Sequence, residues 1–218
     1  MEGVFQIAVD GPSGAGKSTV AKKVAAALSI EYIDTGAMYR AVGYKMLRDG
    51  IELSDRDAIK TMLDNTEIDF ACGETVLDGL IISDKIRTSE VSKMASDASA
   101  LPEVREKLVA LQRAMGRTKS VIMDGRDIGT NVFPDARYKF FLTASVQERA
   151  RRRWLELTEK GQAADIESVE KDIAVRDFND SNRPLNPLKK ADDAIELDTT
   201  EMSIEEAANA IIKIVKNG

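Results

Sequence analysis

The chain has 218 residues, 43% of them hydrophobic, so it can bury a substantial core and is not expected to be disordered. Its 31 basic and 37 acidic residues give a net charge of −6, which argues against a protein whose main task is to neutralise nucleic-acid phosphates. It has one cysteine and no histidine, which excludes an intrachain disulfide, the usual zinc ligands and serine–histidine chemistry.

Neither a membrane span nor a signal peptide is expected. No apolar run reaches spanning length, and the first five residues lack a basic region and have too short an apolar run for a signal peptide. We therefore expect a soluble, cytoplasmic protein.

Two strand–helix units open the chain. An apolar strand over 4–9 precedes a helix over 17–28 with Val20 and Val24 on one face. A second strand over 32–34 precedes a helix that Gly50 can end.

The segment 65–98 has a different pattern. Its apolar residues alternate at first, and Asp78-Gly79 is a strong two-residue hairpin signal. We predict a small antiparallel meander here, inserted between helices, with Cys72 at a packed strand position.

The second half of the chain again alternates helices and strands. The predicted elements are a helix from Pro102, strands over 121–123, 138–142 and 194–197, an arginine-rich helix from Ser145 to Gly161, and a C-terminal helix capped by Ser203 and Glu206. Each of two helices is expected to bury one apolar face: Val104, Leu108, Leu111 and Met115 in the helix from Pro102, and Ile204, Ala208, Ile211, Ile212 and Val215 in the C-terminal helix. Short apolar strands alternating with helices indicate an α/β fold with a parallel sheet covered on both faces. Ligands of such sheets bind at the carboxyl ends of the strands, where Asp10, Asp34 and Asp124 fall.

The first strand and the first helix are joined by a complete Walker A phosphate loop, Gly11-Pro12-Ser13-Gly14-Ala15-Gly16-Lys17-Ser18, followed by Thr19. In such a loop backbone N–H groups converge on phosphate oxygens, Lys17 reaches the β- and γ-phosphates, and Ser18 ligates Mg²⁺. Asp124 is placed like the acid that holds Mg²⁺ through water, with Asp10 as a weaker alternative. The loop predicts a nucleoside triphosphate ligand and leaves the acceptor open.

Transfer of a phosphoryl group depends on positioning and charge neutralisation, for which arginine is well suited. The candidates are Arg40, Arg126, Arg149, Arg151, Arg152, Arg153, Arg176 and Arg183. Arg149 and Arg153 share a helix face, and Arg176 and Arg183, seven apart, can do the same. The arginine run could also suggest RNA binding, but the acidic balance and the lack of interleaved aromatic residues favour a lid that faces phosphates.

Six segments together resemble the bacterial cytidylate kinases, nucleoside monophosphate kinases that phosphorylate CMP and dCMP. They are Asp10–Ser18, Asp34–Arg40, Ile86–Thr88, Asp124–Thr130, Phe133–Ala136 and Arg176–Arg183, in the family's order over nearly the whole chain. The resemblance implies a P-loop kinase with a five-stranded parallel core sheet, a helical lid, and a monophosphate-binding region enlarged by an insert, which matches the predicted meander.

The resemblance also implies one domain over 1–218. Its core would be 1–35, 100–148 and 184–218, its monophosphate-binding region 36–99, and its lid with flanking helices 149–183. The implied reaction is in-line transfer from ATP, with Mg²⁺, to CMP or dCMP in pyrimidine nucleotide metabolism. We expect a monomer, because its amphipathic helices show no obvious second apolar face. We expect neither a nucleic-acid nor a membrane partner.

The resemblance assigns site residues by matching positions. Arg40, Arg126 and Arg183 would contact the CMP phosphate. Thr35, Arg105 and Asp127 would read cytosine, and Ser96, Arg176 and Asp180 would face the ribose. Arg149 and Arg153 would be lid arginines over ATP. The implied catalytic set is Lys17, Arg126, Arg153, Arg176 and Arg183.

One position departs from the family pattern: Thr35 stands where serine is frequent, and its methyl group narrows the rotamers of the hydroxyl. The edge of cytosine offers one amino donor and two acceptors, so a carboxylate paired with a guanidinium complements it. Asp127 and Arg105 supply such a pair and predict a preference for CMP over UMP.

Two other functions stay open at this point. One is a P-loop kinase for UMP, another monophosphate or a non-nucleotide alcohol. The other is a nucleotide-dependent switch or binding module. The chain lacks both the Asn-Lys-x-Asp stretch of GTPase switches and the Leu-Ser-Gly-Gly signature of ABC ATPases.

Overall fold

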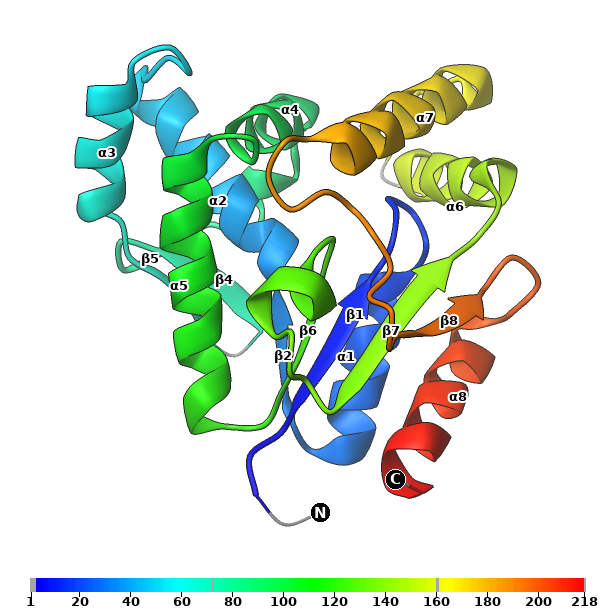
Figure 1. Ribbon diagram of the computed structural model, residues 1–218. Helices are drawn as coiled ribbons and strands as arrows, with labels where there is room; N and C mark the ends of the chain where they lie inside the picture. Colours follow the sequence, from blue (N-terminus) through cyan, green and yellow to red (C-terminus); the bar gives the residue numbers. More distant parts are fainter. Residues whose placement is uncertain (1–2, 72, 160, 218) are drawn as a thin grey trace. The chain divides into compact units, whose positions relative to one another are not determined.

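The computed structural model describes residues 3–71, 73–159 and 161–217 (Figure 1). The chain forms two compact units, one from Met1–Tyr32 and Gly116–Gly218, the other from Ile33–Met115. Cys72, predicted at a packed strand position, lies outside the described residues. Among the helices that are described, none combines the length and the apolar character needed to cross a membrane.

A five-stranded parallel sheet organises the first unit, as predicted. β1 (Gln6–Asp10) lies in its middle and pairs in parallel with β6 (Val121–Gly125) and β7 (Tyr138–Thr143). β8 (Ile195–Asp198) continues the sheet beyond β7, and β2 (Glu31–Asp34) forms the other edge. The division between the two units falls within β2, after Tyr32. The phosphate loop therefore leaves the central strand (Figure 1).

Two helices pack against this sheet through apolar stripes that the sequence shows. α1 (Lys17–Leu28) contributes the buried Val20 and Val24, and α8 (Ile204–Asn217) contributes residues such as Ile211 to the same core. The predicted capping box of α8 is present: the N–H of Ser203 donates to Glu206 Oε2 (2.8 Å) and the N–H of Glu206 to Ser203 Oγ (3.2 Å).

Two further helices of this unit lie side by side (Figure 1). α6 (Val146–Glu159) and α7 (Ile166–Asn182) bury a small apolar cluster of Ala150, Val169 and Ile173. The prediction that Arg176 and Arg183 can share a helix face is wrong. α7 ends at Asn182, and Arg183 has extended backbone angles (φ −62°, ψ 142°).

The second unit is built around α2 (Thr35–Asp49), which begins at its cap Asp34 and ends at Gly50 in the left-handed conformation (φ +67°). α4 (Ser89–Ala98) packs closely on α2, because Gly43 has no side chain: a Cβ there would lie 2.8 Å from the backbone nitrogen of Ala95.

Two other helices belong mainly to this unit. α3 (Arg56–Asp64) is capped by Asp55, and α5 (Pro102–Thr118) buries Val104 and Leu108, as predicted. Leu111 and Met115, expected on the same buried face, are only partly buried.

The predicted meander is present but shorter than expected. It consists of β3 (Ile68–Ala71), β4 (Glu74–Leu77) and β5 (Leu80–Ile81), all antiparallel, with Asp78 and Gly79 both at positive φ in the hairpin turn.

Beyond Ile81 the meander prediction is wrong, because the chain becomes helical in η1 (Lys85–Arg87) and α4. Thr88 caps α4 by accepting the N–H of Val91 (3.2 Å), and residues at helical spacing, Val91, Ala95 and Ala98, are buried.

Candidate active site

The phosphate loop depends on glycine at its first position. Gly11 has φ +146°, and a Cβ there would lie 1.9 Å from the carbonyl oxygen of Leu142 in β7. Gly14 and Gly16 also have positive φ, which turns the backbone back toward α1. The loop is therefore seated against the neighbouring strand, with the positive end of α1 following it.

Lys17 is buried beside this loop, and its Nζ donates to the carbonyl of Pro12 (2.7 Å). Burial, together with the nearby Arg126, lowers the pKa of Lys17 to about 7. A phosphate brought to this position would favour the charged form, so Lys17 is suited to receive an anion.

Ser18 and Asp124, the two residues predicted for Mg²⁺, meet in the structure. The Ser18 hydroxyl donates to Asp124 Oδ2 (2.8 Å), and the Tyr32 hydroxyl donates to Asp124 Oδ1 (2.8 Å). A hydroxyl and a carboxylate are oxygen ligands of the kind that Mg²⁺ prefers, so this donor set fits the ion. Tyr32 was missed by sequence reasoning, because nothing in a short strand marks one tyrosine as a partner of a carboxylate 92 residues away.

Asp10, the alternative metal ligand, is engaged differently. Its Oδ1 accepts the N–H of Ile128 (2.8 Å) and its Oδ2 accepts the N–H of Gly129 (2.7 Å). Burial raises the pKa of this carboxyl to about 6, although the two amides act in the opposite direction. Asp10 is thus bound to a backbone turn, whereas Asp124 contacts Ser18 of the phosphate loop.

Two predicted acceptor arginines are each held by a predicted acceptor carboxylate. Arg126 Nε donates to Asp180 Oδ2 (2.7 Å), and Arg183 Nη2 donates to Asp127 Oδ1 (2.8 Å). Burial alone would raise the pKa of Asp180, but Arg126, with Arg176 and Arg183 nearby, lowers it below its usual value. The four residues thus form two ion pairs.

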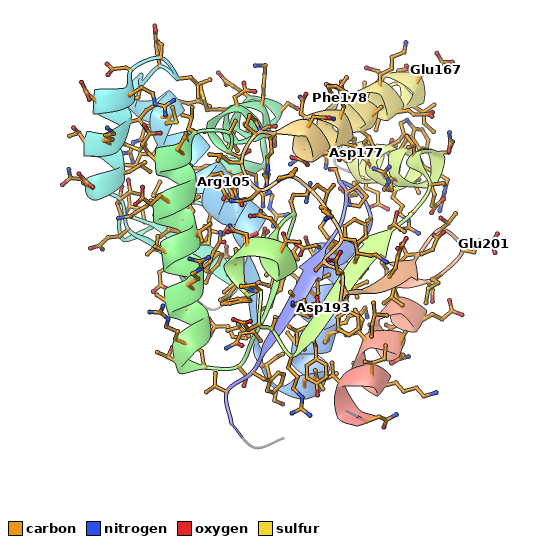
Figure 2. All side chains as sticks on the ribbon, viewed as in Figure 1. Arg105, Glu167, Asp177, Phe178, Asp193 and Glu201 are labelled. Carbon is orange, nitrogen blue, oxygen red and sulfur yellow. The ribbon has the colours of Figure 1, made fainter. Side chains whose placement is uncertain are left out.

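Arg149 lies against the phosphate loop. Its Nε donates to the carbonyl of Ala144 (2.9 Å), and its Nη1 donates to the carbonyl of Ser13 (3.0 Å) and to Asp177 Oδ2 (2.5 Å). Asp177, labelled on α7 in Figure 2, also accepts the N–H of Ser13 (3.4 Å). These contacts join the loop to α6 and α7.

The other lid arginines differ in their surroundings. Arg153 has a side chain that is 41% exposed and pairs with Glu156 (3.0 Å), and Arg176 is half-buried on α7. Arg152, a candidate arginine to which the sequence assigned no role, donates to the carbonyl and hydroxyl oxygens of Thr199 (2.5 and 3.2 Å). Asp177 was missed as a site residue, although it lies within the Arg176–Arg183 segment.

The remaining predicted residues belong to the second unit. Thr35 is buried at the start of α2, and Arg40 folds back to Asp34 (3.0 Å) across Gly36, where a Cβ would lie 3.0 Å from the Arg40 guanidinium. Arg105, labelled on α5 in Figure 2, is buried over the ring of Tyr39 (5.9 Å to the centroid). Ser96 is half-buried on α4.

Comparison with known proteins shows the family to which the chain belongs. The family model for cytidylate kinase matches residues 7–217. A cytidylate kinase of Alkaliphilus oremlandii is 52% identical over 97% of this chain and 97% of its own, and one of Clostridioides difficile is 51% identical over 96% and 97%. A shikimate kinase structure from Bacteroides thetaiotaomicron has a TM-score of 0.50 at 12% identity, covering 98% of this chain and 99% of its own, and shows the shared fold alone. The chain belongs to the cytidylate kinase family.

Proposed function

We propose that this protein transfers the γ-phosphoryl group of ATP to CMP and dCMP, giving ADP with CDP or dCDP. The observation that carries the proposal is the register of two parallel strands, in which Asp10 of β1 pairs with Gly125 of β6. The phosphate loop begins at the next residue of one strand, and Arg126 is the next residue of the other. A donor loop and an acceptor-binding arginine therefore leave the sheet side by side.

The donor side would hold ATP through the loop 11–18, with Thr19 following. Lys17 would contact the β- and γ-phosphates, and Ser18 with Asp124 would hold Mg²⁺. When bound, Mg²⁺ would neutralise charge on the phosphate oxygens. Arg149 would brace the loop through Ser13, and the more exposed Arg153 would be the lid arginine that contacts ATP.

The acceptor residues would divide by the part of CMP that they contact. We assign Arg40, Arg126 and Arg183 to the phosphate, Thr35, Arg105 and Asp127 to cytosine, and Ser96, Arg176 and Asp180 to the ribose. The pairing of Arg126 with Asp180 and of Arg183 with Asp127 supports this, because each guanidinium is already oriented by a carboxylate.

The reaction needs no protein nucleophile, since an oxygen of the CMP phosphate attacks the γ-phosphorus in line with the departing ADP. Lys17, Arg126, Arg153, Arg176 and Arg183 would balance the charge that spreads over the transferred group. We further propose that the protein acts as a cytoplasmic monomer, in pyrimidine nucleotide metabolism, without nucleic-acid or membrane partners.

The test is ADP formation by the purified protein with CMP, dCMP, UMP, AMP, GMP or dTMP as acceptor. We expect CMP and dCMP to be preferred, with Lys17→Met inactive on both as the control for contaminating kinases. Equal rates with UMP and CMP at the same low concentration would refute the cytosine assignment. ADP formation that is as fast without any monophosphate as with CMP would refute the kinase assignment.

A further inference from the structure

Asp10 is a buried carboxylate to which the proposed function assigns no role. It ends β1 directly before the phosphate loop and is only 4% exposed. Its two oxygens accept the backbone N–H groups of Ile128 and Gly129, at 2.8 and 2.7 Å, from a turn 118 residues further along the chain. Burying an ionised carboxylate costs free energy that its hydrogen bonds must offset, and these two bonds hold a turn in place.

The turn that Asp10 holds is the one that presents the acceptor residues. Arg126 and Asp127 follow β6 directly, and the carbonyl of Asp127 accepts two N–H groups, from Asn131 (3.0 Å) and Val132 (3.2 Å), in an irregular wide helical turn. Such turns are frequent at functional sites, since they aim side chains that a regular helix would not.

The contact between the carboxylate and the turn leaves little free space. A Cβ at Gly129 would lie 3.3 Å from Asp10 Oδ2 and 3.3 Å from Cδ of Lys139. The side chain of Asn131 also donates to Asp127 Oδ2 (3.1 Å). Asn131 of the same turn thus orients the Asp127 side chain, and Asp10 fixes the turn itself to the end of β1.

We propose that Asp10 is a positioning residue for the acceptor, which fixes the turn after β6 so that Arg126 and Asp127 face CMP correctly. The inference rests on the function proposed above. It links the donor and acceptor sides through one carboxylate, because the residue next to Asp10 begins the phosphate loop. Asp10 acts through the turn and does not itself contact substrate or metal.

The experiment compares three variants. Asp10→Asn replaces one acceptor oxygen by an amide donor that cannot pair with an N–H, and Gly129→Ala crowds the same contact while keeping the carboxylate. Asp198→Asn is the matched control, since Asp198 also ends a strand of this sheet, and its Oδ1 accepts the N–H of Thr200 (2.9 Å).

Steady-state kinetics should show an effect on the KM for CMP and almost none on the KM for ATP. We expect Asp10→Asn to raise the KM for CMP about 10-fold and to lower the preference for CMP over UMP, because a charged hydrogen bond is lost. The KM for ATP should stay within about 2-fold. Gly129→Ala should act in the same direction by about 3-fold, and Asp198→Asn should change neither the KM for CMP nor the base preference.

Amide hydrogen exchange of residues 126–132 provides a readout that is independent of activity. Asp10→Asn and Gly129→Ala should speed exchange there, relative to the wild type and to Asp198→Asn. If exchange or the KM for CMP stays at the wild-type value in both variants, the inference is wrong. An inactive wild-type protein would refute the proposed function, whereas exchange would still decide whether Asp10 fixes the turn. If Asp10→Asn does not fold, Gly129→Ala alone decides.

Discussion

Arginines assigned to the CMP phosphate are held by carboxylates of the chain itself. Arg183 is nearly buried and donates both to Asp127 and to the carbonyl of Asn186 (2.7 Å). A guanidinium fixed in this way loses little freedom when a phosphate arrives, so more of the interaction can stabilise the transition state.

Replacing Arg183 with alanine should therefore have a large effect. We expect kcat/KM for CMP to fall by about 100- to 1,000-fold, because a charge donor is lost and the buried Asp127 loses its ion pair with Arg183. The control is Lys189→Ala, since we assign Lys189 no contact with either nucleotide, and it should change the rate little. Equal losses in the two variants, measured in the same coupled assay, would contradict the site assignment.

Tyr32 offers a second test at this scale. Tyr32→Phe removes the hydroxyl that donates to Asp124 Oδ1, and we expect the Mg²⁺ concentration for half-maximal rate to rise about 10-fold. Tyr138→Phe is the control: its hydroxyl donates to the carbonyl of Val215 (3.2 Å), so it should cost about 1 kcal/mol of stability without altering the Mg²⁺ titration. An unchanged titration for Tyr32→Phe would mean that Asp124 needs no such support.

Individual side chains were predictable only where a motif names them. The Walker loop predicts Ser18 from its own spacing, and Asp124 follows from the end of an apolar strand. The contact of Arg149 with the carbonyl of Ser13 joins residues 136 apart, and no local pattern encodes it. Arg183 was misplaced because a seven-residue spacing suggests a shared face only while the helix continues, and α7 ends one residue earlier.

At the scale of elements, the packing of α2 on α4 depends on one small residue. Gly43→Ala would place a Cβ 2.8 Å from the nitrogen and 3.1 Å from Cα of Ala95, and a backbone yields less readily than a side chain. We expect a loss of about 1–3 kcal/mol in the free energy of unfolding, measured by urea denaturation.

Gly50→Asn is the comparison for this variant. Gly50 caps the same helix at φ +67° with no atom within 4 Å of its Cβ position, and asparagine accepts the left-handed conformation. Its cost should stay within about 0.5 kcal/mol. A Gly43→Ala variant as stable as Gly50→Asn would show that α2 and α4 can separate without penalty.

Elements with both a cap and a periodic apolar face were predictable. α8 has Ser203 and Glu206 at its start and a buried stripe, and its predicted inward residues lie on the packed side. α4 was missed because two of its three buried positions are alanines, which add little to a hydrophobic pattern although Thr88 caps it. For α5 the pattern predicted too much burial, because its apolar stripe includes Leu111 and Met115, which are only partly buried.

At the scale of the whole molecule, the proposed lid should prevent waste of ATP. If the segment from about Arg149 to Arg176 closes over both nucleotides and excludes water, ATP hydrolysis without CMP should be at least roughly 100-fold slower than transfer with CMP. Phosphate release with and without CMP measures this ratio. Comparable rates in the two conditions would contradict lid-gated transfer.

The discontinuous first unit has a consequence for synthesis on the ribosome. The phosphate loop is made before the segments that hold it, since Gly11 is seated against Leu142 and Ser13 is held by Arg149. Its strand, β1, has neighbours on both sides that are translated only after the whole second unit. The nascent chain therefore carries its nucleotide motif without these contacts until β6 and β7 have been made, and ATP can assist folding only after that point.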